Sequence, residues 1–209
     1  LREGDHDAHA TGVDYNLRFR RNLWRWDGHW IGTRAPVGGT LRDGVGGANR
    51  VNYSGKHVHF NWHVDHFSRG FRNADLGFFS SRPNRTSTNM FAGMGDPDPG
   101  KYYRRLFLGV GAGTTVNSVG VLDRWANLGV DWGLLNFWML GANVGHNFEA
   151  LDDLDTRGGP PIVRPAATWL NVFAATDQRK TWRLSVNGGV SRDAERGADR
   201  QCPLQGKRR

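Results

Sequence analysis

The chain has 209 residues, of which 38% are hydrophobic and 23% are charged, and this length suits one ordinary domain. Its 29 glycines, together with 9 tryptophans and 11 phenylalanines, favour β-structure with tight turns and argue against an all-helical protein. No stretch of about 18 uncharged apolar residues occurs, which excludes a transmembrane helix. Transmembrane strands are not excluded, because their alternating residues average out in a hydropathy profile.

The formal net charge is +8 at pH 7, from 28 Lys and Arg against 20 Asp and Glu. A basic chain with many aromatic residues superficially suits nucleic acid, but no recognised nucleic-acid module occurs and the aromatic residues follow strand periodicity, so we predict no nucleic-acid partner. The single cysteine, Cys202, excludes an intrachain disulfide. The chain begins at Leu1 without an apolar signal-peptide core, and we expect a processed product or a piece of a longer protein.

Three segments are predicted along the chain: a polar N-terminal segment over residues 1–12, a β-barrel domain over residues 13–191, and a disordered basic tail over residues 192–209. Strand-like runs separated by turn-forming residues recur through the middle segment. In chain order they are 13–20, 23–33, 56–67, 102–112, 115–124, 126–134, 137–148, 168–176 and 181–190. Each run is about as long as the 9 to 11 residues that a tilted strand needs to cross a bilayer.

Alternation between apolar and polar residues is the strongest signal in these runs. In the run 56–67, the residues Val58, Phe60, Trp62 and Val64 share one strand face, because side chains in a strand repeat every two residues. The opposite face carries His57, His59, Asn61, His63 and Asp65. The runs that contain Leu106–Val110, Leu128–Leu134 and Trp182–Val186 show the same pattern, with Asn127, Asp131, Arg183 and Asn187 on their polar faces.

Two architectures fit this period. A soluble β-sandwich binding module would bury its apolar faces between two sheets, whereas a transmembrane barrel would turn them toward lipid. Aromatic residues near the ends of several runs, and glycine and charge on the polar faces, favour the barrel. These aromatic residues are Trp24, Trp26, Trp30, Tyr102, Tyr103, Trp125, Trp169 and Trp182.

Longer connections are predicted at residues 35–49, 69–101 and 152–167, which are rich in Gly, Pro and Asp. Alternating long and short connections are typical of outer-membrane barrels, whose turns lie on one side of the membrane and whose loops lie on the other.

Two ordered motifs resemble a known family. The first is Phe71 to Phe79 (FRNADLGFF) followed by Ser81-Arg82, which resembles the signature F-N-x-x-L-G-F-x-x-R of the DUF5916 family. The second is Thr156 to Pro161 (TRGGPP) with Arg164-Pro165, continuing to Ala175–Lys180. The resemblance covers roughly residues 13–191 and implies a bacterial outer-membrane β-barrel domain, usually found C-terminal to a family-9-like carbohydrate-binding domain. This chain resembles a C-terminal part of that family, without the carbohydrate-binding domain.

The histidines offer the sharpest chemical hypothesis, since residues at i and i+2 on one strand face can converge on a Zn²⁺ or Cu²⁺ ion. Only His57 and His59 are close enough, because His63 lies too far along an extended strand at about 3.3 Å per residue. We therefore favour a polar lining for this face over a metal site, and we predict neither a metal nor a cofactor.

Carboxylates and arginines suggest other roles. Asp152, Asp153 and Asp155 could form a calcium loop or a glycoside-hydrolase pair, but a solvated loop is favoured, as it is for Asp96 and Asp98. Arginines could line an anion path or contact lipopolysaccharide phosphates at the membrane rim. These arginines are Arg104, Arg105, Arg157, Arg164, Arg179 and Arg183.

The sequence thus predicts an all-β protein, an antiparallel up-and-down transmembrane β-barrel or partial barrel of about 8 to 10 strands. The expected function is that of a non-enzymatic outer-membrane segment of a channel or transport pore, with lipid or lipopolysaccharide as its partner. The resemblance alone adds a link to oligosaccharide. The lumen-lining residues are predicted to be His57, His59, Asn61, His63, Asp65, Asn127, Asp131, Arg183 and Asn187. The alternatives are the soluble sandwich and, with less support, a glycoside hydrolase-associated domain.

Overall fold

The computed structural model describes residues 8–37, 40–72, 82–155, 159–194, 197–201 and 204–208. Its regular structure consists of strands, ten of them long. The long strands are β1 (His9–Phe19), β2 (Trp24–Val37), β3 (Thr40–Ser54), β4 (Val58–Phe67), β5 (Arg85–Asp96), β6 (Arg105–Val116), β7 (Val121–Gly133), β8 (Met139–Asn147), β11 (Ala167–Ala175) and β12 (Trp182–Asp193). Four short strands complete the set: β9 (Ala150–Asp152), β10 (Ile162–Arg164), β13 (Gly197–Gln201) and β14 (Leu204–Arg208).

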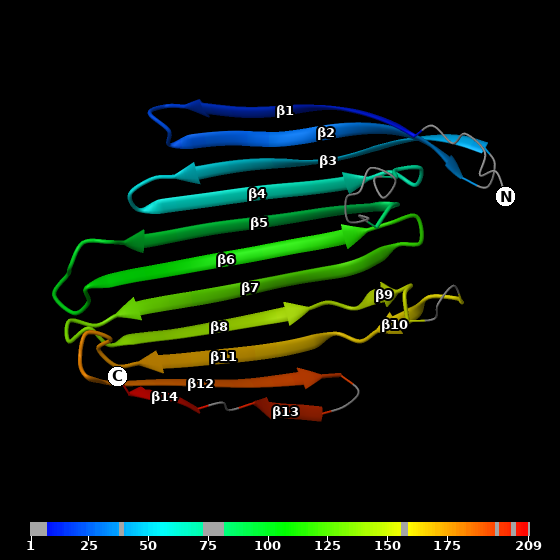
Figure 1. Ribbon diagram of the computed structural model, residues 1–209. Helices are drawn as coiled ribbons and strands as arrows, with labels where there is room; N and C mark the ends of the chain where they lie inside the picture. The colour runs from blue at the N-terminus through cyan, green and yellow to red at the C-terminus, as the bar shows by residue number, and fades with distance from the viewer. Residues whose placement is uncertain are drawn as a thin grey trace.

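The strands form one large antiparallel sheet in which each long strand pairs with its neighbours in the sequence (Figure 1). The order runs from β1 to β8 and continues through β11 and β12 to β13, while β14 also pairs with β12. Strands β9 and β10 form a separate hairpin between β8 and β11. The predicted all-β, antiparallel, up-and-down class is confirmed, and the ten long strands agree with the predicted count. The described strands form an open sheet, in which β1 does not pair with β12, β13 or β14.

Two strands lie where the sequence predicted loops. Strand β3 falls largely within the expected loop 35–49, and β5 falls within the expected loop 69–101. Glycine concealed β3, because Gly44 and Gly46 lack the side chains that would show an alternating pattern. The backbone and ring of Phe71 pack against these two glycines, where a Cβ atom would collide. Strand β5 begins with Arg85-Thr86-Ser87-Thr88, whose small polar residues hide the same alternation.

The boundaries at both ends also differ from the sequence prediction. Strand β1 starts at His9, inside the polar segment predicted for residues 1–12. Strands β13 and β14 lie in the tail 192–209, which was predicted to be disordered. Both pair with β12 through the backbone. The free edge of the sheet offers hydrogen-bond partners to this segment, which therefore forms strands although it lacks apolar alternation.

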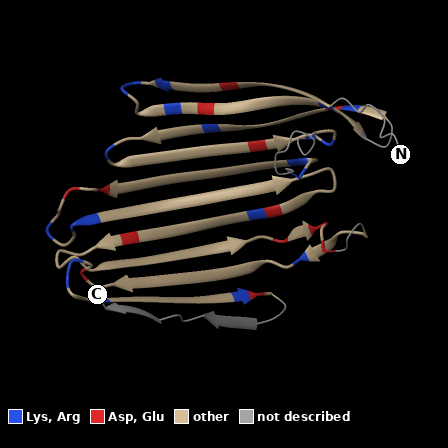
Figure 2. Ribbon diagram, in the orientation of Figure 1, with Lys and Arg blue, Asp and Glu red and all other residues tan. Residues whose placement is uncertain are grey.

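The register gives the sheet two faces of opposite character. The apolar face is formed by the residues that share the orientation of Leu128, which pairs with Val110 on β6 and Val144 on β8. The polar face is formed by the residues that share the orientation of Asn127, which pairs with Gly111 and Gly145. Charged residues with the apolar orientation stand near the ends of the long strands, and they are Arg34, Asp43, Asp96, Arg124 and Arg192. Figure 2 shows Lys, Arg, Asp and Glu mostly toward the turns and strand ends.

The described part of the chain leaves most of the apolar face uncovered, because the one other sheet it forms is the short β9–β10 hairpin, which contacts β7. Among all described residues, the buried apolar ones are Ala35, Phe71, Leu122 and Ala150. None of the large side chains is fully buried. Val110 is 49% exposed and Leu128 is 45% exposed, although both lie in mid-strand. The soluble-sandwich alternative requires a second sheet large enough to cover this face, and the only other sheet among the described strands is the two-stranded β9–β10 hairpin. The described residues also contain no helix long and apolar enough to cross a membrane.

Aromatic rings on the polar face lie across glycines of neighbouring strands. Phe173 on β11 pairs with Gly141 on β8, and Trp169 pairs with Gly145. In both pairs a Cβ atom on the glycine would collide with the ring. The rings therefore lie flat on the backbone, which gives them apolar contact without projecting into the space above the sheet.

We expect Gly141→Ala to destabilise the sheet, because the new methyl group must displace the Phe173 ring. Overpacking of this kind costs about 2 kcal/mol. The measurement is urea unfolding followed by tryptophan fluorescence. Gly188→Ala is the matched control, since the nearest atom to its added Cβ is Val172 Cγ2 at 3.9 Å. Equal unfolding midpoints for the two variants would contradict the packing role of the ring.

Candidate functional site on the polar face

The predicted lining residues share the polar face. His59, Asn61, His63 and Asp65 lie on β4, and His57 precedes it, where its carbonyl accepts a hydrogen bond from the Gly95 N–H at 2.7 Å. Asn127 and Asp131 lie on β7, Asn187 lies on β12, and Arg183 lies near the start of β12. The register gives those within the strands the same orientation across the sheet. Whether this face lines a lumen stays a prediction.

Polar side chains on this face bond across neighbouring strands. Asn61 donates to Asn52 on β3, and the Asn127 amide donates to Asn143 on β8 at 3.3 Å. On β4 itself, His63 Nε2 lies 3.0 Å from Asp65 Oδ1. Each of these side chains keeps hydrogen-bonding capacity beyond the bond described, so the face can still bind water or a polar solute.

His57 and His59, the pair considered for a metal, have separate surroundings. His57 Nδ1 lies 3.1 Å from the Gly95 carbonyl oxygen and 3.9 Å from Asp96 Oδ1. The His59 ring lies 5.9 Å from the ring of Phe107. In the described ranges, no group of three or more His, Cys, Asp or Glu side chains is placed to hold a metal ion.

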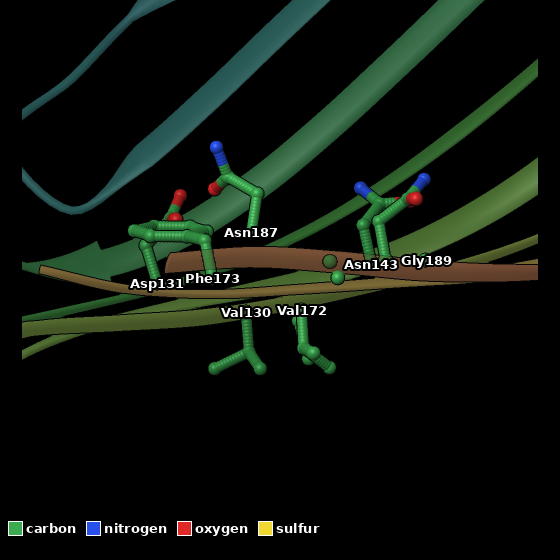
Figure 3. A pocket seen from close by; sticks show the side chains of 11 residues that line it. Val130, Asp131, Asn143, Val172, Phe173, Asn187 and Gly189 are labelled. Atoms are coloured by element: carbon green, nitrogen blue, oxygen red, sulfur yellow. The ribbon is translucent and has the colours of Figure 1, made fainter. Parts of the chain in front are cut away.

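A hollow of about 410 Å³ on the polar face spans β7, β8, β11 and β12. Asn143, Asn171 and Asn187 supply three carboxamides, Asp131 supplies a carboxylate, and Phe173 supplies an aromatic ring. Figure 3 shows Asp131, Asn143, Phe173 and Asn187 on one side of the sheet, whereas Val130 and Val172 point away from it.

Sequence reasoning identified Asp131 and Asn187 in this hollow but missed Asn143, Asn171 and Phe173. The missed residues lie within the predicted runs 137–148 and 168–176, where alternation alone would have placed them opposite Val144 and Val172. Their grouping depends on strand order, because Asn143 pairs with Asn171 across the junction between β8 and β11. The β9–β10 hairpin separates these two strands in the sequence.

A second hollow of about 220 Å³ adjoins the first, since Asp131 lines both. Its charged and aromatic lining comes from Lys56, His59, Asp96, Arg105 and Phe107. A third hollow lies on β1, β2 and β3, again on the polar face. In Figure 3 the more N-terminal strands rise behind Asn187 on the side of the polar side chains. The hollows and this view indicate a sheet that curls toward its polar face.

Two of the three carboxylates in the predicted acidic loop, Asp152 and Asp153, accept hydrogen bonds within the loops. Asp153 accepts hydrogen bonds from Arg82 and from Asn117 at 2.7 Å, and the bond from Arg82 lowers the pKa of Asp153. Asp152 accepts the backbone N–H groups of Leu154 and Asp155 at 2.9 and 3.1 Å. These contacts connect the segment after β9 to the loop before β5 and the turn after β6.

Arginine side chains connect the turns at the opposite end of the sheet. The Phe137 ring, in the turn between β7 and β8, lies 3.1 Å from Arg179 Cζ and 4.7 Å from Arg104 Cζ. Asp177 orients Arg179 through two hydrogen bonds, of 2.9 Å from Nε and 2.8 Å from an Nη atom. These contacts connect three turns at a strand end. Arg164 lies elsewhere, 3.1 Å from Asp123, and Arg157 is outside the described residues.

The hydrogen bonds from Arg179 lower the pKa of Asp177 to about 2. Because the folded pKa lies below the ordinary value of 3.8, the pair stabilises the fold above about pH 4 and loses this effect as pH falls through 2. We expect Asp177→Asn to lower the unfolding midpoint at pH 6 and to have no effect below pH 2. The measurement is thermal unfolding across this pH range.

Asp43→Asn is the control for this titration, since Asp43 forms an exposed pair with Arg34 at 3.6 Å and should change stability little at either pH. A loss of stability in Asp177→Asn that persists undiminished below pH 2 would contradict the assignment.

Comparison with known families gives a match. The family model described as Domain of unknown function (DUF5916) matches residues 1–205, which is nearly the whole chain, and it confirms the resemblance seen in the two sequence motifs. Of those motifs, residues 73–81 and 156–158 lie outside the described residues. No curated protein and no solved structure matches the chain.

Proposed function

We propose, for this chain that belongs to the DUF5916 family, a role as part of the wall of a transmembrane β-barrel in the bacterial outer membrane. The apolar face contacts lipid in this proposal, and the polar face lines a water-filled channel for polar solutes. The observation that carries it is one large sheet across β1–β8, β11 and β12 whose apolar face keeps large side chains such as Val110 and Leu128 about half exposed in mid-strand.

The composition of the apolar face supports contact with lipid. Its mid-strand row from β6 to β12 contains Val110, Leu128, Val144, Leu170 and Val190, each paired with the next. Exposing such a band to water would be costly, at about 25 cal/mol per Å² of apolar surface. An exposed band of this extent is typical of a surface that another apolar phase covers.

Aromatic side chains near the turns support an interface with lipid headgroups. Phe19 stacks on Trp24 at 6.2 Å, and Trp24 contacts Tyr53 at 4.9 Å between ring centroids. All three lie on the apolar face where β1, β2 and β3 meet their turns, and Trp132 and Trp182 lie near the same end of β7 and β12. Such rings are enriched at membrane–water interfaces, because they are apolar with a polar edge.

The open edges set a requirement for this proposal. Strand β1 is hydrogen-bonded to β2 on one side, and the described strands leave its other side without a partner strand. Lipid cannot satisfy backbone N–H and C=O groups, so spanning sheets close on themselves. The proposed barrel therefore needs further strands that pair with β1 and with the edge formed by β13 and β14. These strands would complete the wall.

The hollow at β7–β12 supports a polar, neutral solute such as an oligosaccharide. Three asparagine carboxamides can donate to and accept from hydroxyl groups, and the flat Phe173 ring offers an apolar surface to a sugar ring. Asp131 is the one charged side chain that lines it, so an uncharged solute meets no strong repulsion.

The lipid contact is tested by two substitutions at neighbouring positions of β7. We expect Leu128→Arg to impair folding into liposomes, because a charge on a lipid-facing strand position costs about 3 kcal/mol near the midplane. Asn127→Arg on the polar face should fold like the original chain. The measurement is the fraction that floats with liposomes and shows heat-modifiable gel mobility. Equal folding of the two variants, or full folding of the chain in buffer alone, would overturn the proposal.

The solute class is tested by permeation into liposomes that contain the full chain. We expect flux of a neutral trisaccharide, and we expect Asn171→Leu with Phe173→Ala to reduce that flux several-fold more than the flux of a small ion. Asn89→Leu, on the polar face of β5 outside the hollow, is the control. No flux of any solute would contradict the channel, whereas equal effects on both solutes would contradict the sugar assignment.

A further inference from the structure

A chemically different hollow lies on the same polar face at the other end of the strand order, on β1, β2 and β3. It measures about 350 Å³ and lies where these strands approach the turn that joins β1 and β2. Arg18, Arg25 and Arg50 line it, one from each strand. Asn22, Asn52 and Ser54 add neutral polar groups, and Leu23 completes the lining.

The strand register brings like charges together in this hollow. Arg18 and Arg25 are direct partners across the β1–β2 pair, which places their Cβ atoms about 5 Å apart on the same face. Arg50 on β3 lies diagonally from Arg25 on β2, because Arg25 pairs with Asn52 and Asp27 pairs with Arg50. Like charges directly opposite each other destabilise a sheet, so the pairing of Arg18 with Arg25 does not itself stabilise the fold.

One carboxylate, that of Asp27, neutralises only part of the charge of the cluster. Arg25 Nε lies 2.9 Å from Asp27 Oδ1. Among the residues that the structure describes, Arg18 and Arg50 have no carboxylate within ion-pair distance. Three guanidinium groups thus share one acidic neighbour, and the hollow carries a net positive charge that favours anions.

The turn beside the hollow adds cationic residues in a costly conformation. Arg20, Arg21 and Asn22 have φ values of 50°, 56° and 65°, so three successive non-glycine residues are left-handed. Non-glycine residues rarely adopt this conformation, and strained residues cluster at ligand-binding sites. The turn is closed by a hydrogen bond of 3.2 Å from the Leu23 N–H to the Arg20 carbonyl.

Neutral donors complete the set. The Asn52 Oδ1 atom accepts a hydrogen bond from Asn61, which leaves the Asn52 amino group as a donor. The Ser54 hydroxyl and the Asn22 amide supply further polar groups in the hollow. Guanidinium groups bind tetrahedral oxyanions through two parallel N–H···O bonds, and amide and hydroxyl donors fit the remaining oxygens.

We propose that this hollow binds the phosphate group of a water-soluble, phosphate-bearing molecule. Its position on the polar face, opposite the stacked rings of Phe19 and Trp24, favours a ligand that reaches it from water rather than from lipid. The volume exceeds that of one inorganic phosphate, so the ligand extends beyond its phosphate group. The proposal depends on the arrangement of the three strands and holds whether or not the sheet closes into a channel.

The test is isothermal titration of inorganic phosphate into the full chain, folded in a neutral maltoside detergent. We expect saturable binding at one site per chain and at least a tenfold weakening in Arg18→Gln with Arg25→Gln. Arg25→Lys should also weaken binding, because it keeps the charge but loses the two-pronged geometry. Arg42→Gln is the matched control, since Arg42 is exposed on the same face of β3, toward its other end. Circular dichroism of each variant verifies folding.

Competition identifies the source of the phosphate group. Vesicles of phosphatidylglycerol should not displace inorganic phosphate, whereas a soluble sugar phosphate should. Displacement by the vesicles would assign the hollow to a lipid headgroup and overturn the water-soluble assignment. The absence of saturable binding, or equal weakening in Arg42→Gln, would overturn the site itself. Channel flux does not enter these measurements, so failure of the site and failure of the proposed channel are distinguishable.

Discussion

The constraint on which this structure depends is an apolar sheet face that the described strands leave uncovered. Backbone ladders join every long strand to its neighbours, and cross-strand side-chain pairs supply most of the packing. A globular domain would add a second layer, since burial of apolar surface is the main favourable term in folding. Here Val110, Leu128 and Val144 face outward in the middle of long strands. The proposed function places a bilayer against this face, which would supply the missing apolar contact.

The polar face divides into two chemically different regions. Carboxamides and a flat aromatic ring line the hollow at β7–β12, whereas three arginines line the hollow at β1–β3. Rings such as Phe173 and Trp169 lie over glycines and leave the space above the sheet open. A solute that carries both hydroxyl and phosphate groups would find a partner for each along one surface. This combination connects the proposed channel with the proposed phosphate site.

Much of this arrangement could be predicted from alternation alone. The pattern of β4, with Val58, Phe60, Trp62 and Val64 opposite His59 and His63, assigned faces correctly, because a period of two is a local property. Strands β3 and β5 were missed, since their glycines and small polar residues reveal no period until Phe71 or Phe107 is seen packed against them. The hollows were also hidden, because the meeting of Asn143 with Asn171, or of Arg18 with Arg25, depends on register between strands. Pairing at the free edge of β12, which forms β13 and β14, leaves no apolar pattern.

The most direct test of the central claim is the accessibility of spin labels along β7 in lipid. Single cysteines at positions 126–131, in a chain with Cys202→Ser, would be labelled and measured by power saturation with oxygen and with a water-soluble nickel complex. The account predicts high oxygen accessibility at 126, 128 and 130, and high nickel accessibility at 127, 129 and 131. Accessibility that does not alternate, or nickel accessibility that peaks at position 128, would contradict a sheet with one face in lipid and the other in water.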